Sequence, residues 1–478
     1  MVEVEIGTEF LHGEPRIATV GIDLMDQTLA EQGIATTPTQ WRPPPADIAA
    51  TLGQIALSTE VASANETAVA AITSARPHLV GIGVASASLE LERGTFLHAG
   101  PPIEWDQASG PLRGALIGAA LLEFPDQTPV QLTAHFEAGE FALAPCHSRG
   151  AVGPMAGVVS PSMPVFVVED DVTGRKGFCT LNEGLGKVLR YGAFSPEVLQ
   201  RLRWIESSLA PTISATLGRT GPIDLFAMIA EALQMGDECH NRNRAGTSLL
   251  LRALGPSMFE AANSTSEAAD CFRFIAGNDH FFLNLTMPAG KVAADAARGV
   301  ANSTMVVAMA RNGTEFGLQL AGTGEKWFTG PSGMPQGLLF AGFSEDDANP
   351  DIGDSTITET VGLGGFAMAA APAIVTFVGG SADLAVKSTR SMYEITLSEH
   401  PMFRLASMDY RGTPVGIDAA MVCRSSLLPV VNTGIAGKKA GVGQVGAGLV
   451  EPPLSAFVSA IQYFGEVNRG AFTDDWSE

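Results

Sequence analysis

The sequence predicts a multidomain protein of the α/β and α+β classes that begins with a Rossmann-like domain. Its 478 residues are too many for one ordinary hydrophobic core and suit two to four domains. Strand-like and helix-like segments alternate near the N-terminus, and a β-rich stretch is later followed by a helical one. We therefore expect four units, which cover residues 1–95, 96–194, 195–260 and 261–478.

The Rossmann-like prediction rests on a regular alternation of short elements. The residue pattern predicts strands at 17–23, 34–41 and 78–86, and helices at 24–33 and 65–77. Strands and helices that alternate with short links predict a parallel sheet covered by helices. The first strand–helix turn, VGIDLMD, lacks the GxGxxG pattern, so a bound dinucleotide is not indicated.

The three later units differ from the first in their residue patterns. Residues 128–145 alternate in hydrophobicity like a β-hairpin, and residues 152–170 form another β-rich run, which predicts an α+β unit. Residues 195–260 look wholly helical and predict a small helical domain. From residue 261 onward, helices alternate with glycine-rich strands, which predicts a second α+β unit.

Composition excludes several classes of protein. Hydrophobic residues make up 46% of the chain and charged residues only 17%, so the chain is not disordered. The 29 Lys and Arg against 51 Asp and Glu give a net charge of −22. A surface this acidic repels phosphate backbones and anionic lipids, so we expect neither nucleic acid nor a membrane as a partner.

The uncharged segment Thr360–Ala382 raises the question of a membrane span. It carries five glycines and a central Pro372, and alanine supplies most of its apolar content. A spanning helix needs about 20 strongly apolar residues. We therefore expect a buried helix followed by a strand. The acidic N-terminus indicates no signal peptide, and five cysteines without a CxxC pair indicate a reducing cytoplasm.

The densest polar cluster is MGDECHNRNRAG at residues 235–246, between two apolar helical runs. If one helix covered 238–254, residues at i, i+3 and i+4 spacing would share a face. A helix N-terminus favours anions, and arginine pairs bidentately with oxyanions. We expect proton transfer by His240 and anion binding by Asp237, Arg242, Asn243 and Arg244. The alternative is a solvated turn with an aspartate cap.

Two further segments offer candidates between residues 144 and 190. Cys146 and His147 are adjacent, but neighbours on a strand face opposite ways and cannot act as a nucleophile–base pair. We expect a buried, inert Cys146 and keep His147 as a catalytic candidate. In LNEGLGKVLR (181–190), two glycines between a strand and a helix favour an anion nest or an ordinary capped turn. The candidate ligand-binding residues there are Asn182, Glu183 and Lys187.

A third cluster, DIGDSTITETVGLGG, covers residues 351–365. Its carboxylates alternate with hydroxyls, and the spacing matches no calcium loop. Thr356 and Glu359 fit a capping box, which is the purely structural explanation. The alternative is substrate binding by Asp354 and Ser355, because the glycines that follow allow close approach of the backbone.

Eight long segments resemble, in order, the AllG (YlbE-like) family. They are FLHAGPPIEW, GPLRGALIGAAL, VGPMAGVVSPSMPV, LNEGLGKVLRYGA, MGDECHNRN, GNDHFFLNLTM, DIGDSTITETVGLGGFA and GKKAGVGQVGAG. The resemblance runs from about residue 15 to 465. It implies a subunit of oxamate carbamoyltransferase in purine and allantoin catabolism, which works beside an acyl-CoA-synthetase-like subunit and a third one. It also implies a Rossmann-like N-terminal domain, two α+β domains and a small helical one.

The implied reaction is oxalurate + phosphate ⇌ oxamate + carbamoyl phosphate. Such a transfer passes through a tetrahedral oxyanion, which needs cationic or amide donors. Cations in an apolar, motif-like context are Arg113, Lys187, Arg242, Arg244, Lys326 and Arg411. Among the histidines, which titrate near neutral pH, we expect His240, His147 and His280 to be catalytic. The resemblance brings no assigned catalytic residue.

The sequence contains no HExxH, P-loop, GxSxG or carboxylate–histidine metal spacing, so we expect no metal and no cofactor. The expected ligand is a ureide or carbamoyl phosphate, and the expected partners are the other subunits or a second copy of the chain. Two other functions stay open. One is an amide or ureide hydrolase that uses water in place of phosphate, and the other is a non-catalytic assembly subunit.

Overall fold

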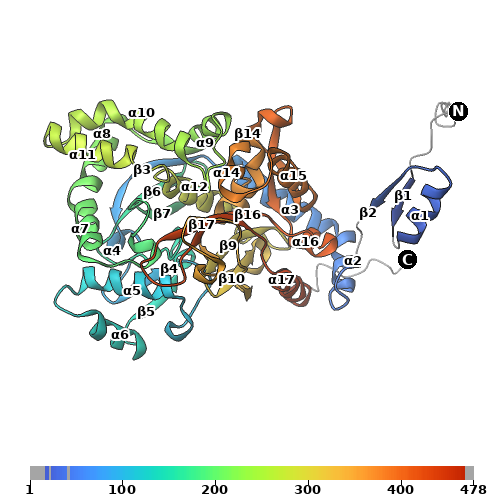
Figure 1. Cartoon of the computed structure of the whole chain (residues 1–478), viewed down its shortest axis with the longest axis horizontal. Helices are drawn as coiled ribbons and strands as arrows, with labels where there is room; N and C mark the ends of the chain where they lie inside the picture. The colour runs from blue at the N-terminus through green and yellow to red at the C-terminus, as the bar shows by residue number, and fades with distance from the viewer. Residues whose placement is uncertain (1–16, 21–22, 40–42, 469–478) are drawn as a thin grey trace.

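The computed structural model describes residues 17–20, 23–39 and 43–468, and it shows a mixed α/β protein with several small sheets (Figure 1). The first unit comprises β1 (Ile17–Val20), α1 (Asp23–Glu31) and β2 (Thr36–Thr39). Its two strands pair in parallel, as the alternation predicts. Residues 21–22 and 40–41 of the predicted strands lie outside the described residues.

The Rossmann-like sheet does not continue beyond β2. The third predicted strand, β3 (Pro77–Val84), pairs antiparallel with β6 (Pro164–Asp170) and with β8 (Ile223–Asp224). β7 (Lys176–Thr180) completes the order β7-β6-β3-β8. The prediction of one parallel sheet is therefore wrong. Alternating strands and helices fit a parallel or an antiparallel sheet. Here the β6 partners of β3 lie 80 or more residues further along the chain.

The helix α12 (Leu283–Ala296) lies in the middle of the molecule (Figure 1). Every residue from Leu283 to Ala294 is buried, because the helix packs on β6 and β7, on α3 (Thr59–Ser74) and on α13 (Ile357–Thr360). Small residues permit this close packing. A Cβ on Gly177 of β7, for example, would lie 2.8 Å from the carbonyl oxygen of Pro288.

Two more sheets lie beyond α12. One has the antiparallel order β11-β10-β9-β13, and the other has the order β12-β17-β16. Their strands are β9 (Val306–Asn312), β10 (Glu315–Leu320), β11 (Phe328–Pro331), β12 (Gln336–Leu339), β13 (Ile352–Gly353), β16 (Val431–Ala436) and β17 (Gln444–Val450). The other elements around them are α2 (Ala49–Leu57), α15 (Ala382–Met392), β14 (Thr396–Leu405), β15 (Arg411–Ile417), α16 (Ala419–Ser425) and α17 (Leu454–Val467). The predicted alternation of helices and strands after residue 261 is confirmed.

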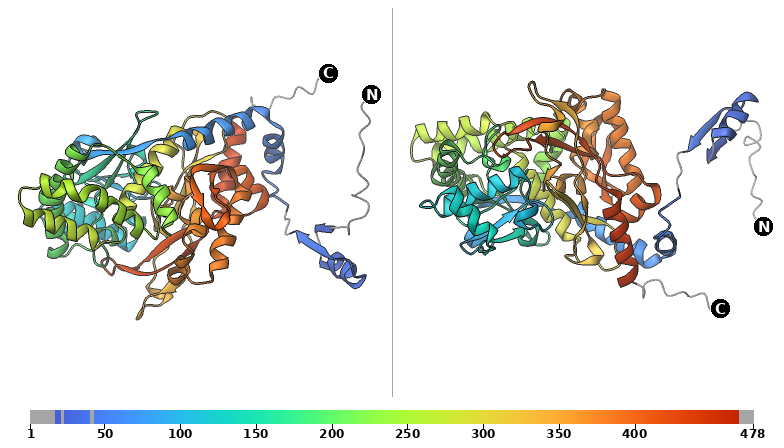
Figure 2. Two further views of the ribbon diagram at one scale, coloured as in Figure 1. Left: turned by 90° about the horizontal axis from the view of Figure 1, so that it is seen from above. Right: turned by 60° about the horizontal axis from the view of Figure 1, so that its bottom comes forward.

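The helical prediction for residues 195–260 is confirmed apart from the two-residue β8 and the loop at residues 235–243. The helices are α7 (Pro196–Trp204), α8 (Ala210–Thr220), α9 (Leu225–Gln234) and α10 (Arg244–Ala261), and α11 (Thr265–Ala276) follows. A π-helical turn, Ile205–Leu209, joins α7 directly to α8. Figures 1 and 2 show these green and yellow helices gathered at one end of the molecule.

The hairpin prediction for residues 128–145 is wrong. Its first half is the helix α6 (Pro129–Glu137), which begins with a proline and a capping box between Thr128 and Gln131. Its second half, β5 (Ala142–Pro145), pairs in parallel with β4 (Thr95–His98). The helix α6 follows α5 (Gly110–Glu123). Its buried residues, Leu132 and Phe136, are four positions apart, a spacing that fits one face of a helix and also one face of a strand.

The glycine-rich segment Thr360–Ala382 is buried without interruption only over its first half. Residues from Thr360 to Ala369 are buried, whereas Ala373 and Thr376 are exposed. The expected helix and strand are wrong, because this fully described segment forms short helical turns, the last of which is α14 (Val375–Val378). Within the described ranges of the chain, every helix is too short or too polar for a membrane span.

The largest apolar core crosses the predicted domain limits. It contains Ala68, Phe166, Ile229 and Val307, which come from all four predicted units. The four-unit division itself stays a prediction.

One buried arginine joins two of the sheets. Arg311, at the end of β9, donates from Nε and Nη2 to the carboxylate of Asp351, at 2.6 and 2.9 Å. Nη1 donates to the Gly353 carbonyl at 2.6 Å and to Thr356 Oγ1 at 3.1 Å. Nη2 also donates to Thr433 Oγ1 in β16, at 3.1 Å. All five N–H donors of the guanidinium are thus used within the protein.

We expect Arg311→Met to destabilise the protein by about 3–5 kcal/mol, because it leaves the Asp351 carboxylate buried without a counter-charge. Urea unfolding followed by circular dichroism measures the change. The matched control is Arg273→Met, which breaks the exposed Arg273–Asp270 pair and should cost less than about 1 kcal/mol. Equal effects of the two substitutions would contradict the structural role of Arg311.

Candidate functional site

The polar segment at residues 235–243 is a buried loop between α9 and α10. The predicted helix from residue 238 is wrong, because α10 begins only at Arg244. The alternative of a solvated turn is also wrong, since Asp237, Glu238, His240 and Asn243 are at most 3% exposed. Its aspartate cap is confirmed, because Asp237 accepts the Gly246 N–H in the first turn of α10. Side chains of the loop form hydrogen bonds with its own backbone groups. Glu238 Oε2 accepts the His240 N–H at 3.0 Å, and Asn243 Nδ2 donates to the His240 carbonyl at 2.6 Å.

His240 is held by Glu359, a buried carboxylate on α13. His240 Nδ1 lies 2.8 and 3.0 Å from the two oxygens of Glu359. Glu359 also accepts hydrogen bonds from the Gly365 N–H and from Thr358 Oγ1, both at 3.0 Å. The predicted capping box of Thr356 and Glu359 is therefore wrong, because both side chains are engaged elsewhere. The pair fixes the orientation of the His240 ring.

Gly364 makes room for this pair. Its φ is +59°, and a Cβ there would lie 2.1 Å from Glu359 Oε1 and 3.0 Å from His240 Cβ. The expectation that glycines after the acidic cluster allow close approach is confirmed at this position.

A small pocket opens beside His240. Its lining residues are Pro154, Met155, Arg190, Tyr191, His240, Asn241, His280, Leu283, Ser355, Gly434 and Gln444. We call it the transfer pocket. Ser355 Oγ and Arg190 Nε are buried and have no hydrogen-bond partner among the described residues. Because an unpaired buried polar group is costly, a ligand or water is expected to bind there.

The transfer pocket contains three predicted residues, His240, His280 and Ser355, and four that sequence reasoning missed. The missed residues are Arg190, Tyr191, Asn241 and Gln444. Arg190 donates to the Gly184 carbonyl at 2.8 Å and packs over the Tyr191 ring. Arg190 ends the LNEGLGKVLR segment, but nothing in the sequence distinguished it from Lys187 as the inward-facing cation.

His280 is a neutral group in this pocket. Burial lowers the pKa of His280 to about 3, and the nearby Arg190 and His240 add to the effect. A proton carrier works best when its pKa is near the working pH. His280 is therefore better suited to hydrogen bonding than to proton transfer.

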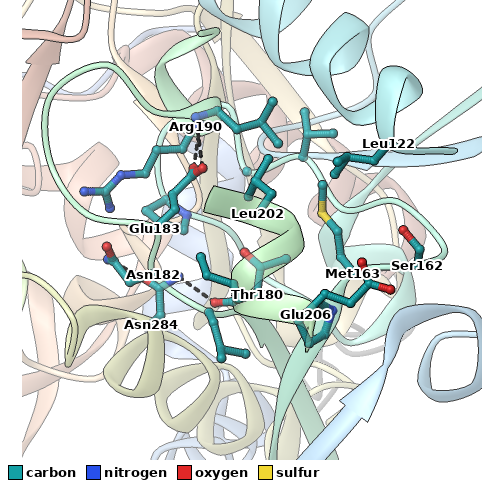
Figure 3. Close-up of a pocket in the computed structure, with 17 residues that line it drawn as sticks. Leu122, Ser162, Met163, Thr180, Asn182, Glu183, Arg190, Leu202, Glu206 and Asn284 are labelled. Carbon is teal, nitrogen blue, oxygen red and sulfur yellow. Dashed lines mark hydrogen bonds between the residues drawn. The ribbon is translucent and has the colours of Figure 1, made fainter. Parts of the chain in front are cut away.

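A larger pocket shares Pro154 and Arg190 with the transfer pocket (Figure 3). The predicted residues Asn182 and Glu183 lie here. Asn182 Nδ2 donates to Asn284 Oδ1 at 2.7 Å and to the His280 carbonyl at 3.0 Å. Glu183 accepts the backbone N–H groups of Leu189 and Arg190. Both residues thus support the backbone of the transfer pocket.

His147 and Asp354 pair with each other away from both pockets. His147 Nε2 lies 3.6 Å from Asp354 Oδ1, and burial, with Lys291 and Arg298 nearby, lowers the pKa of His147 well below its usual value. Asp354 accepts the N–H groups of Gly100 at 2.8 Å and Gly153 at 3.0 Å. The Asp354 carboxylate thus links its own loop to the loops that contain Gly100 and Gly153.

Cys146 is buried beside this pair. Burial and the nearby Asp354 raise the pKa of Cys146 well above its usual value. Its thiol is therefore inert as a nucleophile, which agrees with the expectation.

The remaining predicted residues do not converge on either pocket. Asp237 accepts the Gly246 N–H at 2.9 Å and lies 3.6 Å from Arg242 Nε, so the two stabilise the start of α10. Arg244 is exposed and pairs with Asp279 at 3.8 Å. The residues that line neither pocket are Asp237, Arg242, Asn243, Arg244, Arg113, Lys187, Lys326 and Arg411. A search of the described residues found no group of three or more His, Cys, Asp or Glu that could hold a metal ion.

Comparisons with known proteins agree on one family. Residues 141–355 match the family model described as oxamate carbamoyltransferase subunit AllG. The chain is 45% identical over 412 residues to an Escherichia coli (strain K12) protein named oxamate carbamoyltransferase subunit AllG. That alignment covers 85% of this chain and 98% of the relative.

A second protein of that strain, named uncharacterized protein YahG, is 41% identical over 462 residues, covering 95% of this chain and 98% of YahG. A crystal structure of a conserved protein of unknown function from Enterococcus faecalis V583 superposes with a TM-score of 0.84 at 42% identity. It covers 85% of this chain and 98% of that one, so the similarity extends over nearly the whole of each relative.

The pH dependence of stability should report on Asp354. Burial raises the pKa of Asp354 from 3.8 to about 7, so the folded state keeps a proton that the unfolded chain releases at lower pH. Stability contributed by this group therefore falls as the pH rises from about 4 to 7 and is constant above that range. Relative to Asp354→Asn, the wild type should lose on the order of 4 kcal/mol at most across this window.

Urea unfolding of both proteins from about pH 4 to 8 measures that difference, and other titrating groups cancel in it. A difference that does not change with pH would show that Asp354 keeps an ordinary pKa.

Proposed function

The chain belongs to the AllG family, and on this premise we propose that it is the carbamoyl-transferring subunit of an oxamate carbamoyltransferase. In the proposed reaction, a phosphate oxygen attacks the carbamoyl carbon of oxalurate. The bond from that carbon to the oxamate nitrogen breaks, and carbamoyl phosphate and oxamate leave. One proton passes from phosphate to the leaving nitrogen, so atoms and charge balance.

The observation that carries the proposal is the buried His240–Glu359 pair at the transfer pocket. A carboxylate only accepts hydrogen bonds, so His240 Nδ1 carries the proton and Nε2 is free to act as a base. His240 then accepts the proton of the attacking phosphate and returns it to the leaving nitrogen. Glu359 keeps the ring oriented and stabilises its charged form.

Donors for the anionic groups surround this base. Arg190 is the only Lys or Arg among the residues that line the transfer pocket, and its Nε is unpaired within the described structure. Ser355 Oγ is a second unpaired donor, and Asn241 and the neutral His280 are further hydrogen-bonding groups. A guanidinium with hydroxyl and amide donors suits a carboxylate and a developing oxyanion.

Assembly with other subunits is part of the proposal. The name of the Escherichia coli relative describes a subunit, and 45% identity supports the same kind of assembly for this chain. We propose that it works in the cytoplasm with other carbamoyltransferase subunits, of which the family resemblance implies that one is acyl-CoA-synthetase-like.

The test is formation of carbamoyl phosphate from oxalurate and phosphate by the chain in complex with its other subunits. We expect His240→Gln to lower kcat by about 10²–10⁴-fold, because a glutamine side chain cannot accept a proton and return it. Oxamate binding should change little. Release of oxamate from oxalurate without phosphate would instead identify a hydrolase. A folded chain that binds neither oxamate nor carbamoyl phosphate would identify an assembly subunit.

Anion binding should depend on Arg190. Arg190→Met should weaken oxamate binding by about tenfold to a hundredfold, because it removes a charge-assisted hydrogen bond. Calorimetry measures the affinity, and the melting temperature controls for folding. The comparison is Arg242→Ala, the residue that the sequence favoured. Normal binding by Arg190→Met with weakened binding by Arg242→Ala would move the anion site to the 235–246 loop.

A further inference from the structure

Four large apolar side chains are exposed on the surface around β12. They are Leu338, Phe340, Phe343 and Leu384, and each is 36–47% exposed. Single exposed apolar side chains are ordinary on a protein surface, whereas a contiguous group of them marks a site of interaction. We call this group the β12 patch.

Leu338, Phe340 and Phe343 are neighbours through the backbone. The Phe340 N–H donates to the Val445 carbonyl at 2.8 Å and so continues the pairing of β12 with β17. Leu338 and Phe340 are two positions apart in this extended segment, so their side chains lie on the same face. The Phe343 N–H donates to the Phe340 carbonyl at 3.1 Å, which closes a tight turn and keeps the two rings at its ends.

Two glycines connect Leu384, on α15, to this strand. A Cβ on Gly379 would lie 3.7 Å from Leu338 Cδ2, and a Cβ on Gly380 would lie 2.5 Å from Leu384 Cδ2. The two leucines therefore cover adjacent backbone positions, and the patch is continuous from the strand to the helix.

The strand below the patch is an outer strand of its sheet. The sheet has the order β12-β17-β16, and β12 has the sequence QGLL. Outer strands are usually protected from association by charged side chains or proline, and β12 contains neither. The same sheet carries Gly434 and Gln444, which line the transfer pocket.

Negative charge adjoins the patch. Residues 331–350 contain three carboxylates, Glu345, Asp346 and Asp347, and no Lys, Arg or His. Asp347 accepts hydrogen bonds from the N–H and the hydroxyl of Ser344, both at 3.0 Å, and Glu345 and Asp346 are exposed. These two carboxylates are therefore placed to pair with cations of a partner.

The helix side of the patch adds little net charge. Asp383 and Lys387 flank Leu384, and both are exposed. They are four positions apart on α15, a spacing at which opposite charges offset each other. The excess charge at the patch is thus that of Glu345 and Asp346.

This charge decides between the possible occupants of the patch. A second copy of the chain would bring the same carboxylates into the interface, and two chains that each carry a net charge of −22 repel one another. An anionic membrane surface is repelled for the same reason. A different protein, with apolar side chains at the centre of its interface and Lys or Arg around them, complements both parts of the surface.

We propose that the β12 patch is the docking surface for another subunit of the assembly, one that presents apolar side chains flanked by Lys or Arg. The inference rests on the assembly part of the proposed function. Leu338, Phe340 and Phe343 pack against the apolar side chains, and Glu345 and Asp346 pair with the flanking cations. Burial of apolar surface supplies the affinity, and the charges guide association and select the partner.

Calorimetry of the purified chain with each of the other two carbamoyltransferase subunits tests the surface. We expect Phe340→Asp to weaken the binding of one subunit by at least about tenfold. The matched control is Phe259→Asp on α10, which should bind normally, because Phe259 is 47% exposed, against 45% for Phe340, and lies outside the patch. If Phe340→Asp does not fold, Phe343→Asp places the same charge in the turn beyond the strand.

The charged part of the surface is tested by reversing it. Glu345→Lys combined with Asp346→Lys should weaken binding by about threefold to tenfold, because the new cations repel those of the partner. Added salt should reduce this difference from the wild type, since salt screens exposed charges. An increase in affinity on charge reversal would overturn the proposed partner chemistry.

The remaining outcomes separate the docking surface from the proposed function. Normal binding of both subunits by Phe340→Asp and Phe343→Asp would overturn the docking surface. A wild-type chain that dimerises in sedimentation, with a monomeric Phe340→Asp, would overturn it too, because the occupant would be a second copy. A complex that needs the patch but makes no carbamoyl phosphate would keep the docking surface and refute carbamoyl transfer alone. A wild-type chain that binds neither subunit would refute the assembly together with its docking surface.

Discussion

The buried ion pair of Arg311 and Asp351 is the constraint on which the candidate site depends. A charge removed from water is costly unless it is paired and hydrogen-bonded, and here each partner satisfies the other. The guanidinium also binds Gly353 and Thr433, so it holds β9, β13 and β16 together. The segment that starts at Asp351 is thereby fixed before it turns inward towards the pocket.

That segment also positions His240. Glu359 lies eight residues after Asp351 and joins α13 to the loop between α9 and α10, which is 119 residues away in sequence. Glu238 lies beside it, and burial, together with the charge of Glu359, raises the pKa of Glu238 well above its usual value. Glu238 Oε2 accepts the His240 backbone N–H, so both carboxyl groups position the histidine.

Family membership and geometry answer different questions. Similarity over almost the full length of the relatives establishes the AllG family and supports a carbamoyltransferase role, but it assigns no residue. The structure supplies candidate residues. His240, His280 and Ser355 line one pocket together with Arg190, whereas Arg242 and Arg244 lie at the start of α10.

The sequence by itself determined the local features: the helical stretch at 195–260, the short alternating elements, the polar clusters and the family. These follow from periodicity and residue type within a few turns of chain. Only the tertiary structure decided that β3 pairs antiparallel with β6 and that Glu359 holds His240. The residues joined in these two cases are 80 or more positions apart in the sequence. Local pattern carries no information about which distant strand or charged group will be the partner.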